Sequence, residues 1–173
     1  PPRLAVRLGL GRVVVLSALS AGLYVVYWFY LTWKQLASET TETHHPVRHA
    51  LSLFVPIYGL FKMHHHVKVI NGLVEGAGIV TSLSPGLAVV ILMIRNALAL
   101  SSLRVIDTSA LVGLGLISTA LITYLVASAQ STLNQYWESV RGADLHDARI
   151  GVGEVVIILV GLLVWVDTFL PVE

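Results

Sequence analysis

Long stretches of this chain carry no charged residue, and that feature limits the folds that it can adopt. Of its 173 residues, 55% are hydrophobic and only 12% are Asp, Glu, Lys or Arg. The mean hydropathy is +0.79. Ordinary soluble domains contain about 25% charged residues, so a soluble fold of this size would lack the charges to cover its surface. The sequence therefore predicts one integral membrane domain over residues 1–173.

Other protein classes are excluded by the charge balance and by absent motifs. The 11 Lys and Arg residues nearly balance the 10 Asp and Glu residues and form no basic block, which argues against nucleic-acid binding. No cysteine is present, so disulfides and thiol chemistry are excluded. The sequence contains no Gly-x-Ser-x-Gly, phosphate-loop or His-Glu-x-x-His motif. We therefore expect a non-enzymatic protein without a resident cofactor, in contact with membrane lipids.

The first charge-free stretch has the length of a membrane span. A transmembrane helix needs about 20 apolar residues, and 21 uncharged residues separate Arg12 from Lys34. We predict a span over residues 13–33. Its second half resembles an aromatic belt at the membrane interface, followed by a lysine that reaches the headgroups. The expected interfacial anchors are Tyr24, Tyr27, Trp28, Tyr30, Trp33 and Lys34.

The second span has two interpretations, because Pro85 lies inside the 19 uncharged residues between Glu75 and Arg95. In the first, a kinked helix covers residues 77–94 and Arg95 lies at its end. In the second, Ser84 caps a helix over residues 85–103, and Arg95 lies near the membrane centre. An arginine there costs about 2.5 to 3.5 kcal/mol on insertion scales, which favours the first interpretation.

Two further spans complete the predicted bundle. Thirty uncharged residues between Asp107 and Glu138 predict a helix over residues 110–130, and another is expected over residues 150–170. Residues 47–70 have helical amphipathic spacing and predict a segment at the membrane interface. The fold class is therefore an all-α membrane bundle of about four transmembrane helices plus one interfacial amphipathic helix. A stripe of small and hydrogen-bonding residues predicts the helix-packing seam: Gly113, Ala120, Thr123, Ala127, Gln130 and Asn134.

Three ionisable residues are candidates for polar groups inside the membrane: Glu154, Arg95 and Asp167. Only 12 residues separate the two acids. At about 1.5 Å per residue, both cannot reach water across about 30 Å of hydrocarbon without tilt, thinning or a polar cavity. Glu154 is the better candidate for a buried acid. The alternative is a capped helix start at the interface, where the helix dipole favours an anion.

All seven histidines lie outside the charge-free spans, which disfavours histidine ligation of a haem deep in the bilayer. A surface metal site requires three or four converging ligands. The candidates are His44, His45, His49, His64, His65 and His66. The alternative is an interfacial or pH-sensitive histidine patch that binds no metal.

Orientation follows weakly from the basic residues. Four crossings would place both termini and the 95–107 loop on one side, with five Lys and Arg residues against six on the other. The arginines at positions 3, 7 and 12 favour cytoplasmic termini.

Four segments resemble a family of small bacterial membrane proteins classified only as a domain of unknown function. They are Tyr27-Trp-Phe-Tyr-Leu-Thr-Trp-Lys34, Pro56-Ile-Tyr58 with Phe61, Leu133-Asn-Gln-Tyr-Trp-Glu138, and the segment from Gly153 to Trp165. The His64 to His66 run departs from the family pattern. The resemblance implies a protein of the bacterial cytoplasmic (inner) membrane and implies no activity.

Three functional hypotheses follow. The first is a non-catalytic accessory or scaffold subunit of a larger respiratory, photosynthetic or transport complex. The second is a small transporter or proton-linked module that uses Glu154 and Arg95, and it requires the intramembrane charges to converge. The third is a membrane metal-binding protein that uses the histidine clusters.

Overall fold

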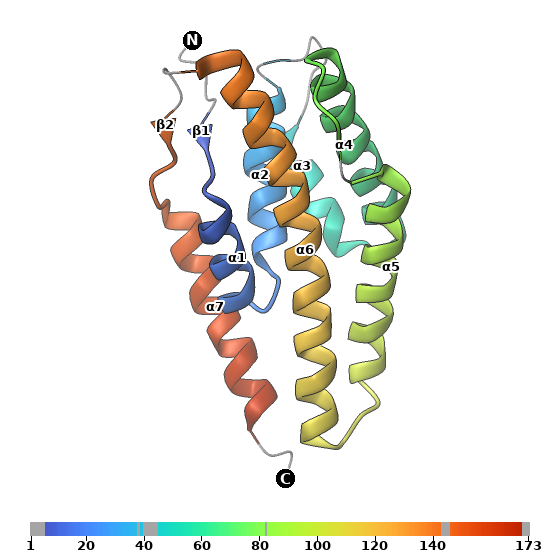
Figure 1. Cartoon of the computed structure of the whole chain (residues 1–173). Coiled ribbons are helices and arrows are strands. Elements are labelled where there is room, and N and C mark those ends of the chain that lie inside the picture. Colours follow the sequence, from blue (N-terminus) through green and yellow to red (C-terminus); the bar gives the residue numbers. More distant parts are fainter. Residues whose placement is uncertain (1–5, 38, 40–44, 82, 143–145, 171–173) are drawn as a thin grey trace.

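The computed structural model describes residues 6–37, 39, 45–81, 83–142 and 146–170, most of which are helical. Figure 1 shows helices arranged along one long axis, with two short strands at one end. In chain order the elements are β1 Val6–Arg7, α1 Leu10–Leu19, α2 Tyr24–Leu36, α3 Pro46–Leu51, the 3₁₀ helix η1 Ser52–Phe54, α4 Pro56–Gly76, α5 Pro85–Ser102, α6 Thr108–Arg141, β2 His146–Asp147 and α7 Val152–Phe169.

Three helices, α5, α6 and α7, are long and apolar enough to cross a membrane. The most apolar stretches have mean hydropathies of 1.6, 2.1 and 2.2, and no more than 22% of any one is buried within the protein. Most of the surface of these helices therefore faces outward, as expected for helices in lipid. The membrane class is supported, with three candidate spans in the described residues instead of about four.

Helix α5 agrees with the second interpretation of its region. Ser84 is the N-cap, and its Oγ accepts a hydrogen bond from the backbone N–H of Leu87 at 3.1 Å. Pro85 is the first helical residue, a position where its missing N–H is not needed. Arg95 therefore lies near the middle of the helix, and the kinked helix over residues 77–94 is wrong. The Ser84 cap therefore determines where this helix starts, although this start places Arg95 near the middle of a candidate span.

The predicted first span is a helical hairpin. Helix α1 ends at Leu19 and α2 begins at Tyr24. Arg12, before the turn, and Tyr24, after it, contact the same Glu154 carboxylate. Figure 1 shows α1 and α2 running in opposite directions. The expectation of one continuous helix over residues 13–33 is therefore wrong, although the uncharged stretch is long enough for a span.

A tight turn at residues 20–23 reverses the chain. Ala21 and Gly22 both have positive φ angles, 51° and 80°, a conformation that glycine adopts most readily. The N–H of Gly22 donates to the carbonyl oxygen of Ser17 at 2.8 Å, and the N–H of Tyr24 donates to Ser20 Oγ at 2.9 Å. Non-helical backbone at membrane depth is tolerated only where its polar groups are satisfied or buried in protein, and these bonds meet that condition.

The molecule has a densely packed half and a more open half. We call residues 24–76 and 125–141 the head, which contains α2, α3, η1, α4 and the C-terminal part of α6. We call residues 85–124 and 152–169 the tail, which contains α5, the N-terminal part of α6, and α7. The largest fully buried side chains are mainly in the head: Trp28, Trp33, Trp137, Tyr24 and Phe29. The predicted interfacial segment, residues 47–70, is divided among α3, η1 and α4, and α4 buries one face within the head.

The ends of the described chain lie at opposite ends of the molecule (Figure 1). β1 pairs in parallel with β2 at the head end, with Val6 opposite His146 and Arg7 opposite Asp147. Helix α7 then runs away from the head to Phe169. The α1–α2 hairpin returns the chain to its starting end, so the prediction that both termini lie on one side of a membrane is not supported by the positions of these ends.

Replacing Gly161 tests the packing of the hairpin against α7. A Cβ atom at position 161 would overlap the backbone of Ser20 in the turn. We expect Gly161→Ala to lower the free energy of unfolding by about 1 to 3 kcal/mol, as overpacking does. The matched control is Gly113→Ala in α6, where a Cβ meets nothing within 4 Å. That change should be neutral or stabilising by up to about 1 kcal/mol. Denaturant unfolding in detergent measures both, and equal effects would refute this packing.

Single cysteines test the hairpin topology, because the natural chain contains none. We expect cysteines placed at Gly9 and Glu75 to react with a membrane-impermeant maleimide from one side of a sealed vesicle. A cysteine at Arg104, in the connection between α5 and α6, should react only from the other side. If residues 13–33 crossed the membrane instead, Gly9 and Arg104 would be labelled from the same side.

Candidate functional site

Glu154, near the start of α7, lies at the centre of a buried polar network. Its side chain is 1% exposed and forms an ion pair with the Arg12 guanidinium, which is 20% exposed. Arg12 Nε donates to Glu154 Oε1 at 3.2 Å, and the Tyr24 hydroxyl contacts the same oxygen at 3.4 Å. The backbone N–H of Gly151 donates to Oε2 at 2.8 Å. Glu154 thus combines the two expected roles, a buried acid and a capping residue of a helix start.

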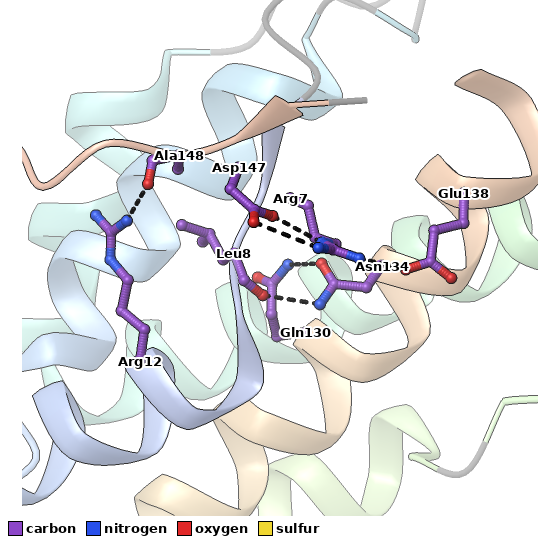
Figure 2. A network of polar contacts seen from close by, with 8 residues as sticks. All are labelled: Arg7, Leu8, Arg12, Gln130, Asn134, Glu138, Asp147 and Ala148. Atoms are coloured by element: carbon purple, nitrogen blue, oxygen red, sulfur yellow. Dashed lines mark hydrogen bonds and ion pairs between the residues drawn. The ribbon is translucent and has the colours of Figure 1, made fainter. Parts of the chain in front are cut away.

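The Arg12 side chain links this carboxylate to the segment before α7. It also donates to the carbonyl oxygen of Ala148, a contact drawn in Figure 2, and to that of Arg149 at 2.8 Å. Buried charges are tolerated when they are paired and their remaining hydrogen-bonding groups are satisfied. The arrangement therefore gives the carboxylate several hydrogen-bond donors and suits a structural clamp.

A second buried chain of hydrogen bonds joins α2, α6 and the start of the chain. The indole N–H of Trp28 donates to Gln130 Oε1 at 2.7 Å, and Gln130 Nε2 donates to Asn134 Oδ1 at 2.8 Å. Asn134 Nδ2 then donates to the carbonyl oxygen of Leu8 at 2.8 Å (Figure 2). The polar end of the predicted seam thus lies at a real helix interface.

The other residues of the predicted seam are less enclosed. Ala120 is exposed, and a Cβ on Gly113 would meet nothing within 4 Å. Thr123 and Ala127 line, with Ala120, an open apolar groove between α1 and α6. The seam is therefore closely packed at Gln130 and Asn134 and more open at its N-terminal residues.

At the surface, Arg7 forms ion pairs with two acidic residues. Its guanidinium donates to Asp147 Oδ1 at 2.7 Å and lies 3.3 Å from Glu138 Oε1 (Figure 2). The hydrogen bond with Arg7 lowers the pKa of Asp147, and the same bond raises the pKa of Arg7. Both side chains are well exposed, so water and salt weaken this contact.

The expected aromatic anchors occupy a different environment from the one that their sequence pattern predicts. Tyr24, Trp28 and Trp33 are fully buried, Tyr27 and Tyr30 are half-buried, and Lys34 is exposed. The reason is the hairpin, because α2 returns into the head and packs against other helices there. Three of these rings therefore form core instead of a belt facing lipid.

Several histidines pack on this aromatic core. His66 in α4 is fully buried, its Nε2 lies 2.9 Å from Thr32 Oγ1, and its ring centroid lies 4.4 Å from that of Phe29. His49 and His65 stack on Trp33 with centroid separations of 4.4 and 5.6 Å. The two predicted histidine groups thus converge on one tryptophan.

Packing of three histidine rings against Trp33 does not by itself arrange them around a metal ion. His45 and His64 are exposed, and His44 lies outside the described residues. Within the described ranges, no group of three or more His, Cys, Asp or Glu residues could hold a metal ion. Ring stacking of this kind stabilises an aromatic core and does not require a ligand.

Arg95 and Asp167 do not join Glu154 in one site. Arg95 Nη1 donates to Asn96 Oδ1 at 3.4 Å, and its buried Nε has no hydrogen-bond partner among the described residues. Asp167 is exposed near the far end of α7. It follows Glu154 by 13 positions, which is about 20 Å along a helix. The three intramembrane candidates therefore occupy three separate places.

No direct signal in the sequence pointed to the partners of Glu154. Arg12 stands before a charge-free stretch and Tyr24 stands inside it, so both resemble ordinary features of a span. Comparison with known protein families, curated proteins and solved structures finds no match for this chain. The function must therefore be argued from the geometry.

A double-mutant cycle tests the structural role of the buried pair. Removing one partner of a buried ion pair leaves an uncompensated charge and costs about 3 to 5 kcal/mol. We expect Arg12→Leu and Glu154→Leu each to destabilise the protein by about 3 kcal/mol, and the double variant to lose less than the sum. Thermal and denaturant unfolding in detergent would measure these changes.

The control is Arg7→Leu, which removes an exposed ion pair at the same end of the molecule. Such pairs contribute about 0 to 1 kcal/mol. Strictly additive effects of the Arg12 and Glu154 substitutions would contradict a direct coupling between them.

Proposed function

We propose that this protein is a non-catalytic accessory or scaffold subunit of a larger assembly in a bacterial cytoplasmic membrane. The observation that supports this best is Arg95, a half-buried cation near the middle of a candidate span. No carboxylate of the described residues forms an ion pair with it, whereas Arg7, Arg12 and Arg141 each have an acidic partner. An intramembrane arginine normally pairs with another group, and a neighbouring subunit could supply that group.

Helix α5 also has an outward apolar face that a second membrane helix could pack against. Met93 and Ile94 are exposed by 53% and 46%, and Val90 is 50% exposed. In lipid, helices associate through packing and polar contacts, since burial of apolar surface gives little driving force there. An acidic or amide side chain of a partner subunit would satisfy Arg95. The buried Arg12–Glu154 pair needs no partner subunit, because its two charges pair with each other within the chain.

The two alternative functions have weaker support. A proton-linked transporter requires Glu154, Arg95 and Asp167 to converge, and the contacts of these residues are separate. A metal-binding function requires His49, His65 and His66 to face a common ion, whereas their rings pack on Trp33. The accessory role therefore accounts for Arg95, which has no acidic partner among the described residues. It assigns structural roles to Glu154 and to the histidines packed on Trp33.

The hairpin also suggests an orientation. With three crossings, nearly all basic residues of the described chain lie at the head end, and the α5–α6 connection contains Arg104. The positive-inside rule then favours a cytoplasmic head. The exposed apolar side chains at η1 and the start of α4 would lie in the membrane interface. The basic residues at the head end are Arg7, Arg12, Lys34, Arg48, Lys62, Lys68, Arg141 and Arg149.

Replacement of Arg95 tests the proposed partner contact. We expect the wild-type protein, purified in a gentle detergent from its native membrane, to retain a stoichiometric partner subunit. Arg95→Leu should reduce the amount of that partner at least about tenfold, the effect of losing about 1.4 kcal/mol. Quantitative mass spectrometry of the purified complex gives the ratio.

Arg104→Leu is the matched control, because it removes the same charge from the exposed end of the same region. It should leave the partner ratio unchanged. Thermal unfolding of each variant identifies any loss that is due to misfolding. Purification of the wild-type chain alone, or equal partner ratios for both variants, would contradict the proposed role of Arg95.

A further inference from the structure

A cleft of about 620 Å³ lies between the tail helices. Its walls come from the end of α5, the first half of α6 and the end of α7, and Ala21 of the α1–α2 turn contributes to its lining. The volume falls within the range of about 300 to 1,000 Å³ that is typical of ligand pockets.

Small side chains and one fixed tryptophan shape the cleft. Ala99 and Gly115 leave space on α5 and α6, and Trp165 of α7 lies 3.6 Å from the position of a Cβ on Gly115. The Trp165 indole N–H donates to the carbonyl oxygen of Ala18 at 2.9 Å. This bond satisfies the polar atom of Trp165 and holds its ring as an apolar wall. The interior of the cleft therefore suits a hydrocarbon chain.

One end of the cleft is polar. The hydroxyls of Ser102 and Thr168 already donate to carbonyl oxygens of their own helices, at 2.8 Å in each case. Asp167 supplies the ionisable group of the cleft lining, and no ion pair joins it to a residue in the described part of the chain. Arg104 lines an adjacent hollow that shares Leu103 with the cleft. The cleft thus offers an acid, and the hollow that shares Leu103 with it offers a base.

This combination matches the chemistry of a zwitterionic phospholipid. An apolar cleft among membrane-spanning helices is poorly suited to water, and unfilled space would forfeit dispersion contacts along its walls. A hydrocarbon chain would restore those contacts. A protonated amine beside Asp167 and a phosphate beside Arg104 would satisfy both charges.

We propose that the cleft binds one phosphatidylethanolamine molecule, with an acyl chain between α5 and α7, the amine beside Asp167 and the phosphate towards Arg104. The lipid completes the packing that α5 and α7 do not make with each other. Because Ala21 contributes to the cleft lining, the bound chain also supports the α1–α2 turn. This site is independent of Arg95 and of the proposed accessory role.

Lipid retention tests the proposal. Delipidated wild-type protein is reconstituted with equal amounts of palmitoyl-oleoyl phosphatidylethanolamine and phosphatidylglycerol, extracted in a mild detergent and analysed by native mass spectrometry. We expect one retained lipid per chain and a two- to fivefold preference for ethanolamine over glycerol. That range corresponds to the energy of a partly exposed ion pair.

Two matched pairs of variants separate the cleft from the general lipid annulus. Ala99→Trp fills the cleft and should abolish retention, whereas Ala97→Trp introduces the same bulk at an exposed position of α5 outside the cleft lining and should not. Asp167→Asn should keep one lipid and lose the headgroup preference. Thr168→Val, which alters a neighbouring residue of the cleft without changing charge, should keep both.

Each alternative outcome is informative. Equal retention by the Ala99→Trp and Ala97→Trp variants, with both folded by thermal unfolding, would overturn the cleft as the site. Retention of no lipid by the wild-type chain, or of a different hydrophobic molecule in the cleft, would overturn a phospholipid as the occupant. An unchanged ethanolamine preference in Asp167→Asn would overturn the amine contact.

Discussion

The buried contact between Arg12 and Glu154 connects the α1–α2 hairpin to α7, which is distant in the sequence. It joins α1 to α7, and the Tyr24 hydroxyl brings α2 to the same carboxylate. A carboxylate in this environment is tolerable only with a full set of partners, so the pair requires both arms of the hairpin to be present. The reversal at residues 20–23, the position of α7 and the burial of α2 in the head all depend on that requirement.

Sequence reasoning identified the membrane class and the regions of the three candidate spans, because length and hydropathy are properties of a segment. It did not identify the hairpin, because these properties do not show whether a chain crosses the bilayer or returns. The signal lay in Ser20-Ala-Gly-Leu23, a short turn inside an apolar stretch. The start of α5 could be read in two ways from the sequence. The Ser84 cap favoured a helix from residue 85, whereas the cost of Arg95 near the membrane centre favoured a helix over residues 77–94. In the structure the helix begins at the cap.

The candidate site could be predicted only one residue at a time. Glu154, Gln130 and Asn134 were recognisable as polar groups on apolar helices. Their partners Arg12, Trp28 and Leu8 come from more than 100 positions away, and a periodic pattern contains no information about such distances. The histidines illustrate the same limit, because clustering along the sequence suggested a metal, whereas tertiary packing places three of them on the face or edge of Trp33.

Helix α6 is longer than a membrane crossing requires. Its 34 residues extend for about 51 Å, whereas the hydrocarbon layer is about 30 Å thick. A crossing by α6 would therefore leave about 20 Å of the same continuous helix beyond the hydrocarbon, as part of the head core. No flexible linker intervenes along α6, so the head is joined rigidly to the candidate span. A protein that binds the head would consequently be held at a defined distance from that span.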